Sequence, residues 1–131
     1  MIVDTSALLA IVFREPGFER LVDSLSAAES TGIGAPTLAE TGVVLQARLG
    51  KDPSGLLARL LQEFAIVTVP FGEAHGREAI AAYARFGRGR HEAALNFGDC
   101  LAYAVARLAG EPLLAVGGDF AKTDLDVVAT D

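Results

Sequence analysis

Apolar residues follow two alternating patterns along the chain. Short apolar runs of strand length are separated by longer stretches in which apolar residues recur every three or four positions, as on one face of a helix. Residues 16–28 hold one such stripe, made of Phe18, Leu21, Val22 and Leu25. This alternation of strand-like and helix-like segments favours an α/β fold with a largely parallel sheet.

The pattern predicts five strands and six helices, without repeats or a long linker. The strands are expected at residues 1–3, 32–35, 66–69, 113–116 and 125–129, of which the glycine-containing segment 32–35 is the weakest. The helices are expected at residues 5–13, 16–28, 36–49, 53–64, 73–85 and 97–109. We therefore expect three layers, with a central, mostly parallel sheet of about five strands flanked by helices and ligands bound at the carboxyl ends of the strands.

Length and composition limit the class of protein. With 131 residues, 51% of them hydrophobic and 21% charged, the chain has room for one domain over residues 1–131 and too much apolar side chain for a disordered protein. Seventeen acidic residues against eleven basic ones give a net charge of -6. Taken alone, this charge argues against a nucleic-acid partner, because phosphate binding normally leaves a basic footprint.

The lone cysteine and the short apolar runs indicate in which cellular compartment the protein is expected. Cys100 has no partner for an internal disulfide and lies in an apolar stretch, so we expect a small core residue in a reducing environment. The longest apolar run, Ala7 to Phe13, has seven residues, too few to cross a bilayer. The N-terminus lacks the basic residues of a signal peptide. We expect a soluble, cytoplasmic protein that does not bind a membrane.

Two acidic residues in the first third of the chain are candidates for chemistry. Asp4 follows the first predicted strand, where it could also act as the N-cap of the next helix. Glu40 lies in the helix opened by Pro36, on a stripe with Val43, Val44 and Ala47. If that stripe faces the core, the carboxylate is buried, and burying an ionised group is costly unless a cation lies nearby.

Two further acids lie near the end of the chain. Asp99 shares a helix face with Ala102, Tyr103 and Ala106, although it could simply complete a capping arrangement with Asn96 as N-cap. Asp119 follows two glycines after the fourth predicted strand and could be an ordinary turn residue.

Together the four acids predict a metal site at one edge of the sheet. Two carboxylates about 4 Å apart repel each other by roughly 4 kcal/mol at an effective dielectric constant near 20, so such a cluster needs a cation. All-oxygen ligation selects Mg²⁺ or Mn²⁺ over zinc. We interpret His75 and His91 as surface or loop residues and not as ligands. Assigning four acids to a metal accounts for most of the excess negative charge and weakens its argument against nucleic acid.

Three segments resemble the motifs of PIN-domain ribonucleases, and more narrowly of VapC-type toxins from bacterial toxin–antitoxin pairs. Asp4-Thr5-Ser6-Ala7-Leu8 resembles the opening motif of the family. Arg88-Gly89-Arg90-His91, together with residues 95–104, is similar to the internal motif of the family. Leu113-Leu114, together with residues 117–120 and 122–124, is similar to the closing motif. The match covers essentially the whole chain and keeps the order of all four acids. Members often carry an acid or Asn where this chain has Gly118, which makes the metal contact of Asp119 the least secure.

The resemblance implies a metal-dependent endoribonuclease that hydrolyses RNA by metal-activated water, leaving a 5′-phosphate and a 3′-hydroxyl. Asp4 and Asp99 would be the principal metal ligands, and Glu40 and Asp119 would complete the site directly or through water. Ser6 would support these ligands without contacting the metal itself. A VapB-type antitoxin whose C-terminal segment places a basic side chain in the acidic groove is also implied. The apolar helices over Ala39–Leu49 and Leu56–Phe64 suggest a homodimer.

The segment from Arg85 to His91 is the candidate surface for RNA. Arg85, Arg88 and Arg90 place three positive charges in this stretch without an acid among them, and a flexible solvated loop is the alternative interpretation. The RNA target, transfer or ribosomal, does not follow from these residues.

Two other classes of protein compete with this hypothesis. The chain could be a catalytically inactive PIN scaffold that only binds a partner. Phosphoaspartyl phosphatases and receiver domains also use acidic Mg²⁺ sites, but the phosphatases need a second Asp where this chain has Ser6, and receivers need an Asp after the third strand, where Pro70 and Phe71 follow Val69.

Overall fold

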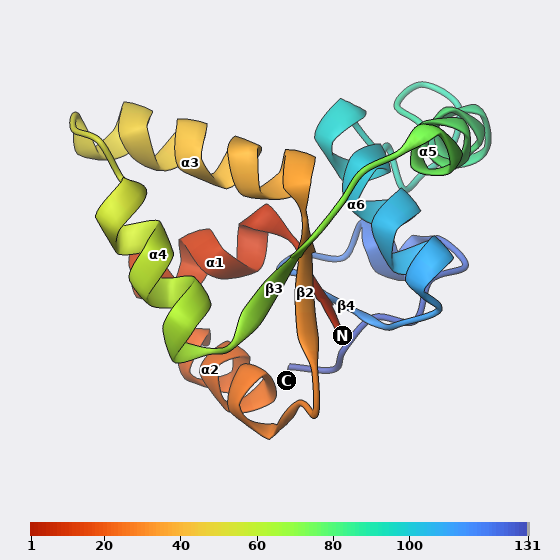
Figure 1. Cartoon of the computed structure of the whole chain (residues 1–131). Helices are drawn as coiled ribbons and strands as arrows, with labels where there is room; N and C mark the ends of the chain where they lie inside the picture. Colours follow the sequence, from red (N-terminus) through yellow and green to blue (C-terminus); the bar gives the residue numbers. More distant parts are fainter. Residues whose placement is uncertain (131) are drawn as a thin grey trace.

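A parallel sheet forms the centre of the protein. The computed structural model describes residues 1–130, and four strands of this part form the sheet: β1 (Ile2–Val3), β2 (Thr31–Gly34), β3 (Ile66–Val69) and β4 (Leu113–Leu114). Their order is β3-β2-β1-β4, and every neighbouring pair is parallel, with Ile2 opposite both Gly32 and Leu113 (Figure 1). The predicted α/β fold with a parallel sheet is confirmed.

Six helices lie within the described chain, close to their predicted positions. They are α1 (Thr5–Val12), α2 (Phe18–Ala27), α3 (Ala35–Leu49), α4 (Ser54–Glu63), α5 (Glu73–Phe86) and α6 (Phe97–Ala109), followed by a short 3-10 turn at Phe120–Lys122. Gly50 and Gly110 end α3 and α6 in the left-handed conformation, with φ of 70° and 66°, as is common for a glycine that closes a helix. The second helix starts at Phe18 and not at Pro16, because Gly17 has a φ of 90° and interrupts the chain there.

The fifth predicted strand, residues 125–129, is reduced to one bridge in the described structure. Val127 pairs with Leu113 in parallel, with hydrogen bonds from Leu113 N to Asp126 O and from Val128 N to Leu113 O, both 2.9 Å. The strand beside it, β4, spans only two residues and offers few groups for pairing. The sheet therefore has four strands, with the C-terminal segment attached at the β4 edge.

The weakest predicted strand, β2, lies in the interior of the sheet, and all four of its residues are buried. Its glycines allow close packing. A Cβ atom on Gly32 would lie 2.9 Å from Cγ2 of Val69, and one on Gly34 would lie 2.7 Å from Cγ2 of Val105 in α6. The glycines that weaken the strand pattern therefore let β3 and α6 approach β2.

Two apolar clusters cover the two faces of the sheet. Adjacent strand residues point to opposite faces, so Ile2 and Leu113 join the cluster with α5 and α6, whereas Val3 and Leu114 join the cluster with α1 and α2. Cys100 is 2% exposed in the first cluster, which confirms it as a core residue. Within residues 1–130, no helix is both long and apolar enough to span a membrane.

Candidate active site

Asp4 lies immediately after β1, where it caps α1. Its Oδ2 accepts hydrogen bonds from the backbone N of Ser6 at 3.1 Å and from Oγ of Ser6 at 2.6 Å, so the predicted capping role is confirmed. The Ser6 hydroxyl also accepts a hydrogen bond from the backbone N of Val116 at 2.9 Å. Ser6 thus connects Asp4 to the segment after β4, which leads to Asp119.

The electrostatic environment of Asp4 disfavours its charge. The residue is 5% exposed, and burial raises the pKa of its carboxyl group above the ordinary value, with a further contribution from the negative charge of Glu40. The hydrogen bonds from Ser6 and Thr5 act in the opposite direction without cancelling this increase. A buried carboxylate with an acid beside it would be stabilised by a nearby cation.

Glu40 approaches this site from α3. Its Oε1 lies 3.0 Å from the hydroxyl of Thr5, which is also 3.2 Å from the carbonyl oxygen of Thr37. Oε2 faces the first turn of α6, where a Cβ atom on Gly98 would lie only 2.6 Å away. The carboxylate is therefore held between the start of α1 and the start of α6, next to the residue that precedes Asp99.

The predicted burial of the Glu40 face is wrong. Val43 is 66% exposed and Ala47 is also exposed, whereas the buried face of α3 carries Thr37, Thr41 and Leu45. Thr41 can occupy this face because its hydroxyl finds acceptors there, the carbonyl oxygen of Thr37 at 2.8 Å and the hydroxyl of Thr5 at 3.0 Å. Glu40 is exposed, and its side chain extends from α3 to contact Thr5 at the start of α1.

Asp99 occupies the first turn of α6 in a reciprocal capping box. The side chain of Asn96 accepts a hydrogen bond from the Asp99 backbone N at 2.8 Å, and Oδ2 of Asp99 accepts one from the Asn96 backbone N at 3.0 Å, which confirms the capping alternative. Burial raises the pKa of Asp99, and the charges of Asp4 and Asp119 add to the increase. The hydrogen bond from Asn96 and the positive charge of Arg88 oppose it.

Asp119 lies on an exposed turn between Gly118 and the 3-10 turn. Gly117 adopts a φ of +94°, a left-handed conformation that favours glycine, so the chain can turn sharply before Asp119. The carbonyl oxygen of Asp119 accepts a hydrogen bond from the backbone N of Lys122 at 3.2 Å. Asp119 is therefore a turn residue, and its negative charge also contributes to the raised pKa of Asp99.

The four predicted acids interact electrostatically with one another at one end of the sheet. The charge of Glu40 acts on Asp4, and the charges of Asp4 and Asp119 act on Asp99. In the part of the chain that the structure describes, no three His, Cys, Asp or Glu side chains come close enough together to form a ready metal-binding group. The candidate donors of the four acids are all carboxylate oxygens, a donor set that fits a hard divalent cation.

The two histidines accept hydrogen bonds from nearby backbone groups. Nδ1 of His75 accepts a hydrogen bond from the backbone N of Gly72, and Nδ1 of His91 accepts one from the backbone N of Ala93, both at 3.0 Å. His75 therefore caps the N-terminus of α5, whose first turn contains it, whereas His91 supports a turn of the loop between α5 and α6.

The three predicted RNA-binding arginines have different surroundings. Arg85 pairs with Oδ2 of Asp124 at 3.3 Å, and the guanidinium of Arg90 lies 5.7 Å from the centre of the Tyr83 ring. Arg88 is the one whose charge acts on Asp99. The sequence placed all three in one patch free of acids, but Asp124 comes from a distant segment and partly neutralises Arg85.

An open groove of about 740 Å³ lies between α5 and α6, and its lining includes Asn96 and Cys100, which flank Asp99 in the first turn of α6. Its lining is mostly apolar and includes Ile80, Tyr83, Phe97 and Leu101, together with Arg88. Ile80 and Phe97 are 73% and 77% exposed. The groove therefore presents unusually accessible apolar side chains beside a charged site.

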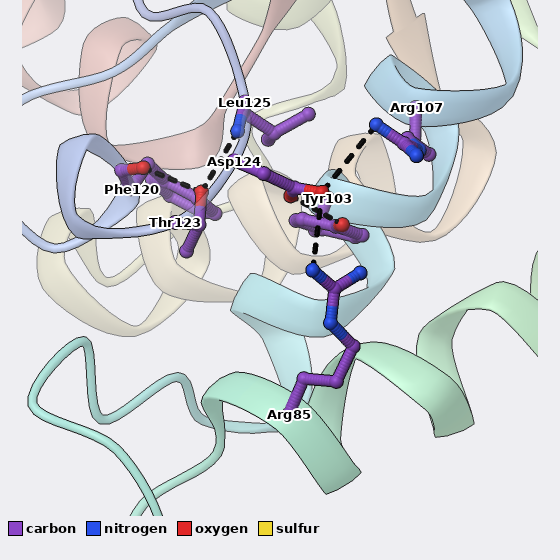
Figure 2. Close-up of polar contacts among 7 residues, drawn as sticks. All are labelled: Arg85, Tyr103, Arg107, Phe120, Thr123, Asp124 and Leu125. Atoms are coloured by element: carbon purple, nitrogen blue, oxygen red, sulfur yellow. Dashed lines mark hydrogen bonds and ion pairs between the residues drawn. The ribbon is translucent and has the colours of Figure 1, made fainter.

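Sequence reasoning missed three residues that shape the site. Thr5 and Gly98 surround the carboxylate of Glu40, and Asp124 connects the C-terminal segment to α5 and α6 (Figure 2). Thr5 and Gly98 each adjoin a candidate acid in the sequence, which is a usable signal. The partners of Asp124 are at least 17 residues away in sequence, so only the fold brings them together.

Comparison with known proteins identifies the family. The PIN domain model matches residues 1–125. Ribonuclease VapC36 of Mycobacterium tuberculosis is 46% identical over 127 residues, covering 96% of this chain and 91% of the relative, and ribonuclease VapC28 of the same species is 44% identical over 124 residues, covering 94% and 93%.

Solved structures share the fold. VapC20 of Mycobacterium tuberculosis, described as a toxin that cleaves the sarcin-ricin loop, superposes with a TM-score of 0.78 at 19% identity, covering 97% of each chain. FitAcB from Neisseria gonorrhoeae superposes with a TM-score of 0.69 at 25% identity, covering 98% of this chain and 96% of the other. With its parallel sheet and an acidic edge at the ends of β1 and β4, the chain belongs to the PIN-domain family and, within it, to the VapC ribonucleases.

Proposed function

We propose that the chain is the endoribonuclease toxin of a type II toxin–antitoxin pair and hydrolyses phosphodiester bonds in RNA at its four-acid site with a divalent metal ion. The observation that carries this proposal is the convergence of acids from separate elements at the ends of the strands: Asp4 after β1 is 5% exposed, and the Glu40 carboxylate of α3 lies between Thr5 of α1 and the backbone of Gly98 beside Asp99. Burial raises the pKa of both Asp4 and Asp99, and the charges of Glu40 on Asp4 and of Asp4 on Asp99 add to the increase. Carboxyl groups whose pKa values are raised by burial and by neighbouring acids are typical of a site built to hold positive charge.

The residues would divide the work as follows. Asp4 and Asp99 would be the principal ligands of Mg²⁺ or Mn²⁺, and Glu40 and Asp119 would contact it directly or through water. Ser6 and Thr5 would orient the carboxylates of Asp4 and Glu40 through the hydrogen bonds they already make. When bound, such an ion lowers the pKa of water and stabilises the charge that develops on the phosphate.

Substrate phosphates need a positive group near the acids. Arg88 meets this requirement best among the three candidate arginines, because its charge acts on Asp99. Arg90 lies two residues away and could contact a neighbouring phosphate, whereas Arg85 is held by Asp124. We therefore propose Arg88 as the main RNA contact, with Arg90 and Arg85 in supporting roles.

A cleavage assay with matched variants tests the proposal. Wild type, Asp4→Asn and Asp99→Asn are compared with Asp52→Asn, which removes an exposed acid at the start of α4. We expect Mg²⁺-dependent cleavage of RNA by the wild type and Asp52→Asn, loss of at least about 100-fold in the other two variants, and no cleavage in excess EDTA. Equal cleavage by all four proteins, or full activity in EDTA, contradicts the proposal.

The alternative function is RNA binding without cleavage. It would be supported if the wild type bound RNA in the presence of Mg²⁺ but left it intact at every concentration. Purification of the variants from a strain lacking the major ribonucleases keeps a contaminating activity from obscuring this result.

An antitoxin is the second proposed partner. Structurally similar proteins include chains described as a toxin–antitoxin complex from Klebsiella pneumoniae, with a TM-score of 0.71 at 17% identity, covering 99% of this chain and 97% of the other. We infer a VapB-type antitoxin whose C-terminal segment places a basic side chain among the four acids. Inhibition of RNA cleavage by the antitoxin, and its loss when that basic residue is changed to Ala, would support this partner.

A homodimer is the third proposal, and the structure offers two exposed apolar surfaces for it. In α4, Leu60 is 7% exposed and Leu56 and Leu57 are half-buried, so this helix offers little free apolar area, whereas Val43 in α3 is 66% exposed. Phe97 and Ile80 in the groove between α5 and α6 are 77% and 73% exposed and lie close enough to line one groove. We propose this face for the dimer, and a Phe97→Ser variant that sediments as a monomer while the wild type sediments as a dimer would support it. A monomeric wild type contradicts it.

The domain organisation and compartment also remain proposals. We infer a single domain over residues 1–131, which is supported by one continuous sheet and by a family match over residues 1–125. We place its activity in the cytoplasm, where its proposed RNA substrates lie and where Cys100 would stay reduced.

A further inference from the structure

The C-terminal segment is fastened to the two helices beside the site through one carboxylate. The hydroxyl of Tyr103, a residue in α6 that is 1% exposed, donates a 2.6 Å hydrogen bond to Oδ1 of Asp124. The other oxygen, Oδ2, pairs with Arg85 of α5 at 3.3 Å and with Arg107 of α6 at 3.4 Å (Figure 2). Asp124 thus joins three donors from two helices.

This set of contacts makes Asp124 a tether and leaves it poorly suited to bind metal. Partial burial works against its charge, but the hydrogen bond from Tyr103 and the charges of Arg85 and Arg107 lower its pKa overall. Its carboxylate is therefore ionised and already balanced by positive charge. A group with both oxygens engaged in this way has little capacity left for a cation.

The segment between Asp119 and Asp124 is folded tightly, so the tether acts on Asp119. The backbone N of Lys122 donates to the carbonyl oxygen of Asp119, and the hydroxyl of Thr123 donates to the carbonyl oxygen of Phe120 at 2.6 Å (Figure 2). Phe120 is 4% exposed and belongs to the core cluster of α6. A displacement of Asp124 would therefore be transmitted along this turn.

Tyr103 and Asp99 lie four residues apart in α6, so they occupy the same face of that helix in successive turns. One end of this face presents Asp99, and the next turn holds Asp124 through Tyr103. The C-terminal segment then runs from Asp124 back to Asp119, whose charge acts on Asp99. The C-terminal segment is therefore connected to α6 at two places, through the hydrogen bond from Tyr103 to Asp124 and through the interaction of Asp119 with Asp99.

We propose that Asp124 and Tyr103 are positioning residues that hold Asp119 opposite Asp99. Neither touches the substrate, and both act through the turn at Phe120–Lys122. This inference deepens the proposed function and rests on it for its consequence in catalysis. Its structural part, the fixed placement of Asp119, can be measured without RNA.

Tyr103→Phe is the sharpest variant, because it removes one hydroxyl and keeps the buried ring. Asp124→Asn is the second variant, and Arg77→Ala is the matched control, since it breaks an exposed ion pair with Glu73 on α5 away from this network. The first measurement is amide hydrogen exchange of residues 117–123 in metal-free protein. We expect exchange to be about tenfold faster in Tyr103→Phe, because a hydrogen bond to a charged group is lost, and unchanged in Arg77→Ala.

The second measurement is Mn²⁺ binding by calorimetry, made also in an Asp119→Asn background. We expect Tyr103→Phe to weaken Mn²⁺ binding several-fold in the wild-type background and to have little further effect once Asp119 is gone, because the tether acts through that residue. In RNA cleavage, kcat should fall while KM stays within about twofold of the wild type.

Three results would overturn the proposal. Exchange of residues 117–123 could be unchanged in Tyr103→Phe, or its effect on Mn²⁺ binding could be just as large without Asp119. A loss of melting temperature with no change in exchange at this segment would also assign the contact to general stability. A wild type that fails to cleave RNA would contradict the proposed function alone, since hydrogen exchange still decides the role of the tether.

Discussion

The carboxylate of Glu40 packs against the backbone of Gly98, so closely that a Cβ atom at position 98 would lie 2.6 Å from Oε2 and 3.0 Å from Oε1. Gly98 lies in the first turn of α6, next to Asp99. The partial positive charge at a helix N-terminus favours a carboxylate in this location. The absence of a side chain at Gly98 thus lets an acid from α3 approach the acid of α6.

Replacing Gly98 by Ala is expected to reduce RNA cleavage by at least about tenfold while leaving the protein folded. The added methyl group would push the Glu40 carboxylate away, whereas Ala is favoured over Gly by about 1 kcal/mol within a helix. Initial cleavage rates and melting temperatures of the purified variant check this. Gly55→Ala in α4 is the matched control, because nothing lies within 4 Å of a Cβ atom there. Wild-type activity in Gly98→Ala would contradict the assigned role of Glu40.

Replacing Thr5 by Val is expected to lower both stability and activity. The change keeps the shape of the side chain but removes the hydroxyl that lies 3.0 Å from Oε1 of Glu40. Loss of hydrogen bonds in this buried network should cost about 1–3 kcal/mol in the free energy of unfolding. Denaturant unfolding and cleavage rates measure the two effects.

Thr41→Val separates the two effects, because Thr41 belongs to the same hydroxyl network without contacting Glu40 in it. We expect a similar loss of stability and a smaller loss of activity. Equal losses of activity in Thr5→Val and Thr41→Val would mean that the network supports the fold and not the orientation of Glu40.

The parts of the site that depend on neighbouring residues were predictable from the sequence. The spacing of Asn96 and Asp99 predicted a capping box because both groups belong to one helical turn, and the structure contains it. The position of Asp4 after a buried strand likewise followed from local pattern.

The individual side-chain contacts that depend on tertiary packing were not predictable, although the parallel topology did predict that the acids gather at one edge of the sheet. The buried face of α3 was misassigned because Thr37 and Thr41 are polar by composition, yet they occupy that face, where the Thr41 hydroxyl has acceptors within the protein. The contact between Glu40 and Gly98 joins residues far apart in sequence, and so does the pairing of Asp124 with Arg85. Neither the hydrophobic periodicity nor a short sequence motif predicts contacts between residues so far apart in the chain.

Cys100 is expected to resist alkylation in the folded protein. Its side chain is buried at 2% exposure, and burial, with a smaller contribution from the charge of Asp99, raises the pKa of the thiol to about 11. At pH 8 the reactive thiolate is therefore scarce as well as inaccessible. Labelling with iodoacetamide should be roughly 100-fold slower in native buffer than in guanidinium chloride. Rapid labelling of the native protein would contradict the buried position.

The raised pKa of Asp4 predicts how stability depends on pH in metal-free protein. The folded state holds this proton more tightly than the unfolded state, whose pKa is near 3.8, so the contribution of Asp4 to stability falls as pH rises from about 4 through the higher folded pKa. Asp4→Asn removes this loss and keeps a good N-cap, so it should melt about 3 °C or more above the wild type at pH 8 in EDTA, with the difference vanishing near pH 4.

Mn²⁺ should raise the melting temperature of the wild type and not that of Asp4→Asn, because the ion compensates the buried charge. Thermal unfolding from pH 4 to 8, with and without Mn²⁺, measures both effects, and a variant that is less stable than the metal-free wild type at every pH would refute the assignment of Asp4 as a buried, uncompensated acid.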